Sequence, residues 1–117
     1  MKVTTMSIKG VNLLQIIEEM RKFDPQMESQ AIAVFFIVRL REGTDGVSMQ
    51  SIAKELDLAQ SSVSRNVFKL SVINRHRDKG VGLLESYEDP TERRRKLVKT
   101  TAKGKRVWDT LADLVKQ

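Results

Sequence analysis

The hydrophobic positions of the first forty residues follow the three- and four-residue spacing of amphipathic helices. Over residues 10–23 the apolar residues recur on one helical face, and Asp24-Pro25 then interrupts the pattern. That face is made of Leu13, Leu14, Ile16, Ile17 and Met20. A second helix is expected over residues 26–41, before the turn-forming residues 43–46. We expect these two helices to form a scaffold.

Residues 48–71 contain two short apolar-periodic segments separated by only a few residues, which is the spacing of a helix-turn-helix. Ser48 can cap the first helix through its hydroxyl, and Asp57 can adopt the left-handed conformation at the turn. In the second helix an apolar stripe of Val63, Val67 and Leu70 fixes which side faces solvent. The polar residues predicted to reach DNA from this helix are Gln60, Ser61, Ser62, Ser64, Arg65 and Lys69. Arg65 can form two hydrogen bonds with a guanine base, and Lys69 is expected to contact a phosphate.

Residues 83–100 have the pattern of a β-hairpin, with strands over 83–87 and 96–100 around an Asp-Pro turn. Its tip and returning edge carry four cations that can enter a minor groove or bind phosphates, namely Arg93, Arg94, Arg95 and Lys96. A last helix is expected over residues 102–116, with a wide apolar stripe. The expected fold is therefore mostly α, a winged helix-turn-helix of about five helices plus a two-stranded β wing.

The size and composition of the chain narrow its class. The 117 residues, 40% hydrophobic and 31% charged, suit one globular domain over residues 1–117. The chain contains no cysteine, which excludes disulfides, thiolate zinc sites and thiol catalysis. The longest apolar run, residues 31–38, is far shorter than the roughly 20 residues of a membrane span, and no apolar signal-peptide core is present. We expect a cytoplasmic protein that does not insert into a membrane.

The positive charge lies mainly in the second half of the chain. The net charge is +6, and residues 65–106 hold thirteen Lys/Arg against five Asp/Glu. Charge alone would suit nucleic acid, an acidic protein or a membrane surface. Together with the helix-turn-helix and the wing, it favours double-stranded DNA. Arg75 and Arg77, in the segment that links the helix-turn-helix to the wing, are added to the predicted DNA contacts.

No catalytic constellation is apparent in the sequence, and an enzyme is not expected. His76 is the only histidine, and it lies in a basic segment without a positioned partner. Gly80-Val81-Gly82 lacks the further glycine and the Lys-Ser/Thr of a phosphate-binding loop. We therefore predict no catalytic, cofactor-binding or metal-binding residues.

The segment DPTERRRKLVKTTAKG, residues 89–104, resembles the wing signature of the MarR family, Asp-X-Arg, five residues, Leu-Thr-X-X-Gly. The matching positions are Glu92, Arg94, Thr101 and Gly104. Upstream, LAQSSVSRNVFKL resembles the recognition helix of the family, so the resemblance covers nearly the whole chain. It implies that Arg94 reaches the minor groove, that Glu92 orients Arg94, and that Thr101 caps the last helix.

Several residues depart from the family pattern. Glu92 stands where the family prefers Asp, and Thr100 where it prefers Leu. Ala59 replaces the usual Asp or Ser cap, and Phe68 lies on the outward face of the recognition helix, where a polar residue is expected. The link over residues 71–82 is longer than usual. The departures at Glu92 and Thr100 indicate that the wing is anchored differently from the family pattern. For Phe68, a contact with protein instead of DNA is an alternative.

Three functions stay open at this point. The favoured one is a sequence-specific transcription regulator, with a nonspecific or architectural DNA binder and a protein-binding winged helix as alternatives. We expect a homodimer through the first and last helices, and a monomer in which both apolar stripes pack internally is the alternative. Many MarR-like regulators respond to small phenolic ligands. This chain has only five aromatic residues besides Trp108, so the sequence does not support the binding of such an effector.

Overall fold

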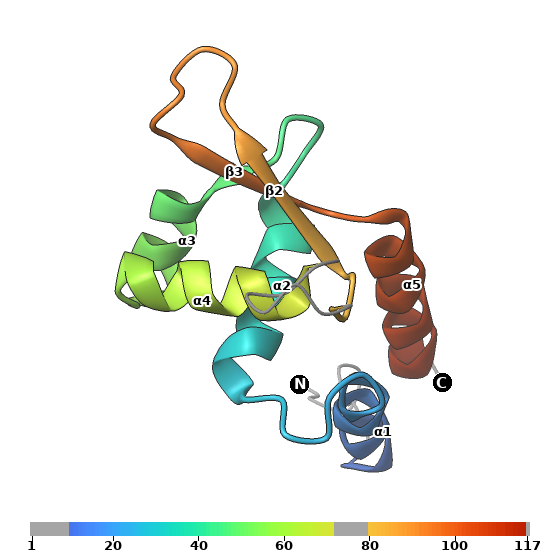
Figure 1. Cartoon of the computed structure of the whole chain (residues 1–117). Coiled ribbons are helices and arrows are strands. Elements are labelled where there is room, and N and C mark those ends of the chain that lie inside the picture. The colour runs from blue at the N-terminus through green and yellow to red at the C-terminus, as the bar shows by residue number, and fades with distance from the viewer. Residues whose placement is uncertain (1–9, 72–79, 117) are drawn as a thin grey trace, which may run out of the picture.

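A computed structural model of the protein describes residues 10–71 and 80–116. The described residues form five helices and a three-stranded antiparallel sheet, which confirms the predicted winged helix-turn-helix (Figure 1). In chain order the elements are α1 (Gly10–Arg21), α2 (Ser29–Arg41), β1 (Val47–Ser48), α3 (Met49–Leu56), α4 (Gln60–Leu70), β2 (Leu84–Glu88), β3 (Lys96–Thr100) and α5 (Ala102–Lys116). None of these helices is both long and apolar enough to cross a membrane.

The sheet has one strand more than the sequence predicted. Its order is β1-β3-β2, with Val47 opposite Val98 and Leu84 opposite Thr100. The predicted two-stranded wing is β2 and β3, and the additional strand β1 is only two residues long. So short a strand has no alternating pattern that a sequence can reveal. Its pairing with β3 attaches the start of the helix-turn-helix to the base of the wing.

The first two helices have different bounds from those predicted. α1 ends at Arg21 instead of residue 23, and α2 begins at Ser29 instead of residue 26. Asp24 accounts for the late start of α2, because its side chain accepts a hydrogen bond from the Gln26 amide (2.9 Å) and its carbonyl accepts one from the Met27 amide (2.9 Å). A polar side chain that bonds its neighbouring backbone in this way competes with helix formation.

The corner of the helix-turn-helix confirms the predicted roles of its residues. Ser48 caps α3, since its hydroxyl accepts a hydrogen bond from the Ser51 amide at 3.0 Å. Asp57 ends α3 in the left-handed conformation, with φ 55° and ψ 50°. Aspartate tolerates this conformation better than most residues that have a Cβ atom. The chain thereby reverses sharply enough for α4 to start at Gln60.

The hydrophobic core lies between α2, the helix-turn-helix and the base of the wing. Phe35 and Val38 of α2, Ile52 of α3, and Leu84 and Val98 of the wing strands are fully buried in it. Val63, Val67 and Leu70 of α4 join the same cluster, as their stripe predicted. Burial of these three side chains fixes the rotation of α4 about its own axis, and therefore fixes which residues the helix presents to solvent.

The start of α5 is packed closely against the segment that precedes β2. A Cβ atom on Gly104 would lie 2.2 Å from the carbonyl oxygen of Leu83, so no larger residue fits there without movement of the backbone. Thr101 caps the helix, as the family resemblance implied. Its hydroxyl accepts a hydrogen bond from the Gly104 amide (3.0 Å) and donates one to the Gly82 carbonyl (2.6 Å). This cap sets the direction in which α5 leaves the wing.

Helices α1 and α5 lie side by side at the end of the molecule opposite the tip of the wing (Figure 1). The apolar stripe of α1 is only partly covered by the rest of the chain, because Met20 is buried whereas most of the stripe is exposed. The exposed fractions are 57% for Val11, 50% for Leu13, 59% for Leu14 and 43% for Ile17. A pocket beside α1 and α5 continues this apolar surface and is lined by Ile16, Phe36, Trp108, Leu111, Ala112 and Val115.

Candidate nucleic-acid interface

The exposed face of α4 carries the residues that the sequence predicted for DNA contact. Gln60, Ser61, Arg65 and Lys69 are exposed, and Ser62 and Ser64 are half-buried. They stand on the helix away from the buried stripe, and α4 contains no Asp or Glu. This face therefore offers hydroxyl, amide and cationic groups, and no carboxylate of its own opposes a polyanion.

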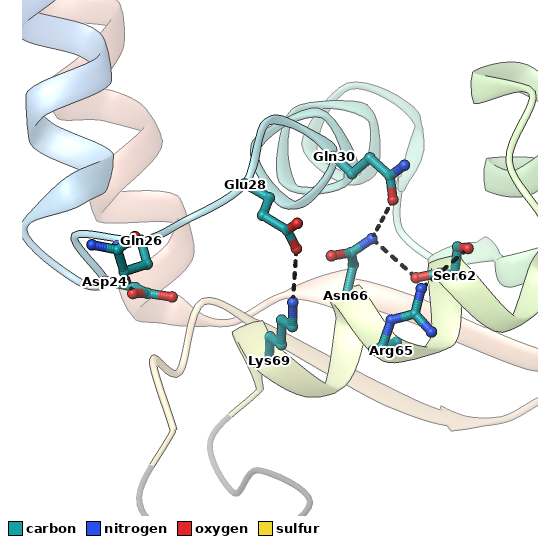
Figure 2. A network of polar contacts seen from close by, with 8 residues as sticks. All are labelled: Asp24, Gln26, Glu28, Gln30, Ser62, Arg65, Asn66 and Lys69. Atoms are coloured by element: carbon teal, nitrogen blue, oxygen red, sulfur yellow. Dashed lines mark hydrogen bonds and ion pairs between the residues drawn. The ribbon is translucent and has the colours of Figure 1, made fainter.

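A polar network that sequence reasoning missed holds α4 against the start of α2 (Figure 2). Asn66 of α4 is buried, and its side-chain amide donates to the Gln30 side chain (3.3 Å) and to the Ser62 carbonyl (3.0 Å). In the same helix, Arg65 donates to the Ser62 hydroxyl at 3.4 Å. Asn66 lies next to the apolar stripe in a helical projection, but the sequence has no signal that pairs it with Gln30. Of these contacts, the one between Asn66 and Gln30 joins α4 to α2.

Lys69 has a carboxylate partner, which the sequence did not indicate. Its ammonium lies 3.0 Å from the Glu28 carboxylate, immediately before α2 (Figure 2). The pKa of Glu28 is lowered, first by the hydrogen bond from Lys69, then by the positive charge of Lys69, with a smaller effect from Arg65. Both side chains are in contact with solvent, with 47% of Lys69 and 69% of Glu28 exposed, so the pair is open to exchange with other ions. A phosphate that binds Lys69 would compete with Glu28.

Asp89 organises the tip of the wing. Its side chain accepts hydrogen bonds from the Thr91 amide (2.9 Å) and the Thr91 hydroxyl (2.8 Å), and these two bonds are the largest causes of its lowered pKa. Its amide donates to the Arg95 carbonyl at 2.9 Å, which closes the turn. Asp89 also lies 3.8 Å from the Arg95 guanidinium. One carboxylate thus orders the turn and holds one of the wing arginines.

Arg93 and Arg94 stand at this tip without such a partner. Both are exposed, and among the described residues neither makes a side-chain hydrogen bond or an ion pair. The orienting contact from Glu92 to Arg94 that the resemblance implied is not present in this part of the chain. Glu92 instead takes part in the turn through its backbone, since its carbonyl accepts from the Arg95 amide at 2.9 Å. Asp89, which starts the turn, has the ordering role.

The wing and the helix-turn-helix meet at a shared hollow on the surface. Its lining includes Gln50 of α3, Gln60 of α4, and Glu92, Arg94, Arg95 and Lys96 of the wing. Gln60 and the wing cations, predicted separately from two motifs, therefore face one space. Lys96 also lies 3.7 Å from the Glu88 carboxylate across the hairpin. Gln50 was not predicted; the sequence signal that could have pointed to it is a polar residue in the first turn of the first helix of the helix-turn-helix.

Two of the predicted DNA contacts belong to the part of the sequence between α4 and the wing. Arg75 and Arg77 lie outside the described residues, as does His76. At the end of α4, the Gly82 amide donates to the Ser71 carbonyl (3.0 Å) and the Leu83 amide donates to the Leu70 carbonyl (2.8 Å). These two bonds hold Gly82 and Leu83 against the C-terminal end of α4. Within residues 10–71 and 80–116, no group of three His, Cys, Asp or Glu side chains could hold a metal ion.

Comparison with known proteins gives similarity at the level of the fold. No family model and no curated protein matches the chain. Among solved structures, a complex of S. aureus MepR with DNA has a TM-score of 0.69 at 19% identity, over 91% of this chain and 77% of that one. MarR has a TM-score of 0.61 at 16% identity, over 89% of this chain and 72% of that one.

A transcriptional regulator of the MarR family from Rhodococcus is also similar, with a TM-score of 0.63 at 22% identity over 92% of this chain. The present chain spans 66% of the length of that regulator, slightly less than two thirds. The similarity to this regulator and to the MepR–DNA complex extends over more than nine tenths of the chain. This protein therefore has the winged helix-turn-helix fold of MarR and of the MarR-family regulator from Rhodococcus.

Proposed function

We propose that the chain is a sequence-specific, double-stranded-DNA-binding transcription regulator. In this proposal α4 enters the major groove, and the wing arginines contact the adjacent minor groove and phosphates. The observation that carries the proposal is the shared hollow, where Gln60 of α4 faces Arg94, Arg95 and Lys96 of the wing. One continuous surface thus combines side chains that can read base edges with cations that can neutralise phosphates.

The similarity to the MepR–DNA complex supports the same function. That protein binds DNA with a fold closely related to this one, and the surface of the present chain has the charge that DNA binding needs. α4 contains no carboxylate, and the neighbouring wing tip bears four consecutive cations. Arg75 and Arg77, in the part of the sequence that follows Ser71, stay predicted contacts.

We infer that the regulator is a homodimer through α1 and α5. Four large apolar side chains of α1 are exposed, as is Val115 of α5 at 42%, and the pocket between these helices is apolar. A contiguous apolar surface of this kind is typical of an interface. A two-fold dimer would place two copies of α4 on successive major grooves, which accounts for recognition of a palindromic site by a short helix.

The experiment that tests the proposal is the selection of duplexes from a random pool, followed by titration of Arg65→Ala on the selected site. Arg65 is exposed in the middle of α4, and arginine pairs with the O6 and N7 atoms of guanine. We expect a loss of about 1–3 kcal/mol on the selected site, a relaxed preference at one base position, and nearly unchanged nonspecific binding.

The alternatives predict different results in the same experiment. An architectural DNA binder would select no preferred sequence and would show a steep dependence on salt. In that case Arg65→Ala would lower the affinity for all duplexes equally. A winged helix that binds only protein would retain no duplex in the selection. Either result would contradict the proposal, and the salt dependence would separate the two.

A further inference from the structure

Phe68 is the large apolar side chain that α4 exposes to solvent, with 47% of its surface accessible. We propose that its ring contacts the 5-methyl group of a thymine in the major groove, and that Phe68 thereby sets a preference for a T·A pair. The inference rests on the proposed function, because it assumes that α4 lies in that groove. It assigns base specificity to a residue that departs from the family pattern.

The position of Phe68 follows from the helical spacing of α4. Ser61, Arg65 and Phe68 are separated by four and then three residues, so they lie on one face of the helix. The opposite face is the buried stripe of Val63, Val67 and Leu70. Phe68 therefore stands a little less than one helical turn, or roughly 4.5 Å along the axis, beyond Arg65 on the same exposed face. A duplex that receives the guanidinium of Arg65 also meets this ring.

The residues around Phe68 favour an apolar contact at this end of the helix. The Asn66 side-chain amide is buried and donates to Gln30 and Ser62, and the Lys69 ammonium is held by Glu28 at 3.0 Å. The hydrogen-bonding side chains on either side of Phe68 thus already have partners. Among the groups on the major-groove edges of base pairs, the thymine methyl is the apolar one, and phenylalanine is a side chain that contacts it.

The surface near Phe68 is less suited to a protein partner. Ser64, Arg65 and Lys69 lie beside it on the helix, so among the described residues of α4 the ring is an isolated apolar group in a polar, cationic surface. Protein interfaces are centred on contiguous apolar patches from which charged residues are depleted. The positive charge of this face instead complements a polyanion. A DNA base is therefore the partner that these observations favour.

The test replaces thymines of the selected duplex one at a time with deoxyuridine, which keeps base pairing and removes only the 5-methyl group. For the wild-type chain we expect about a fourfold loss of affinity at one thymine in each half-site, the effect of one buried methyl-sized group. Phe68→Ala should bind the thymine duplex about as weakly as the wild type binds the deoxyuridine duplex. It should also be insensitive to the replacement at that position.

Two further variants make the result specific. Phe68→Leu keeps an apolar side chain and should retain part of the sensitivity to the methyl group. Leu40→Ala removes a comparably exposed apolar side chain from α2 and should behave like the wild type. Any effect of deoxyuridine on the duplex itself would appear equally in every variant. Circular dichroism would establish that all three variants are folded.

The outcomes separate this inference from the proposed function. If the wild type selects a site but no thymine is sensitive, or if Phe68→Ala keeps the full sensitivity, the thymine contact is wrong and the regulator proposal stands. If Phe68→Ala binds every duplex as the wild type does, the inference is again wrong, and a protein contact becomes the better explanation of this ring. If the wild type binds no duplex, the proposed function itself fails.

Discussion

The Glu42 carboxylate, 5% exposed at the end of α2, accepts two hydrogen bonds from Thr100 at the end of β3. One comes from the Thr100 amide and the other from its hydroxyl, both at 2.7 Å. Arg39 lies 3.8 Å from the same carboxylate, and its guanidinium stands 5.9 Å from the ring centre of Trp108 in α5. The hydrogen bonds between Glu42 and Thr100 therefore attach the wing to α2, and Arg39 connects the Glu42 carboxylate to the last helix. Threonine at position 100, where the family pattern has leucine, is explained by these two hydrogen bonds to Glu42, which we call the Glu42–Thr100 anchor.

We expect Thr100→Val to lower the free energy of unfolding by roughly 1–3 kcal/mol, because the substitution keeps the shape of the side chain but leaves a buried carboxylate oxygen without its donor. Urea unfolding followed by circular dichroism measures the change. Thr44→Val is the matched control, since Thr44 is exposed and makes no side-chain hydrogen bond among the described residues. It should stay within about 0.5 kcal/mol of the wild type. Equal losses in both variants would show that the anchor contributes little.

Arg94→Ala should weaken duplex binding more than Arg95→Ala. Arg94 has no partner within the described residues and lines the shared hollow, whereas Arg95 lies beside Asp89 at 3.8 Å. Removal of a freely available cation at the groove should cost roughly 1–2 kcal/mol, or about five- to thirtyfold in Kd. A fluorescence anisotropy titration at one fixed salt concentration compares the two variants. If both losses are negligible, or if that of Arg95→Ala is the larger, the assignment of Arg94 to the groove is wrong.

Glu28→Gln should raise the affinity for all duplexes alike, because it removes the carboxylate that competes with phosphate for Lys69. The salt dependence of binding should become steeper by up to about one unit, and Lys69→Ala in the Glu28→Gln background should reverse this change. Lys69→Ala alone should reduce the salt slope by less than one unit, since Glu28 already neutralises part of its charge.

The control for this prediction is Glu55→Gln, which changes the net charge equally but removes the partner of Arg41 instead. A similar gain in both variants would attribute the effect to net charge and would contradict a local role for Glu28. The pH dependence gives a second check. The pKa of Glu28 is lowered, so its carboxylate competes at neutral pH and still does so at the ordinary glutamate pKa. The advantage of Glu28→Gln should disappear only as the pH falls through that lowered value.

Leu14→Asp should convert the dimer into folded monomers that bind a palindromic duplex much more weakly. The substitution places a charge in the exposed apolar surface of α1, where it would be buried at the interface. Leu111, in α5, is unsuitable for this test because it is already buried within the chain itself. Leu40→Asp is the control, since Leu40 has the same 59% exposure as Leu14 but lies on α2. Light scattering that finds a monomeric wild type would refute the dimer.

The features that the sequence predicted correctly depend on residues close together in the chain. The stripe of Val63, Val67 and Leu70, the Ser48 cap and the left-handed Asp57 each involve a few consecutive turns of backbone. The Thr101 cap, which the family resemblance implied, has the same local character, and so does the hairpin of β2 and β3 around its Asp-Pro turn. Periodicity and backbone hydrogen bonding act over such short distances, so the order of the amino acids is enough to predict these features.

The features that only the tertiary structure decided join residues far apart in the sequence. Asn66 meets Gln30 at a separation of 36 residues, Lys69 meets Glu28 at 41, and Thr100 meets Glu42 at 58. The two-residue strand β1 exists because β3 is beside it. Such pairs form only after the apolar faces of the helices and strands have packed and brought their polar edges together. The sequence alone predicted the five helices, the two wing strands and the side of α4 that faces solvent, whereas packing added β1 and decided which side chains on that side of α4 already have partners.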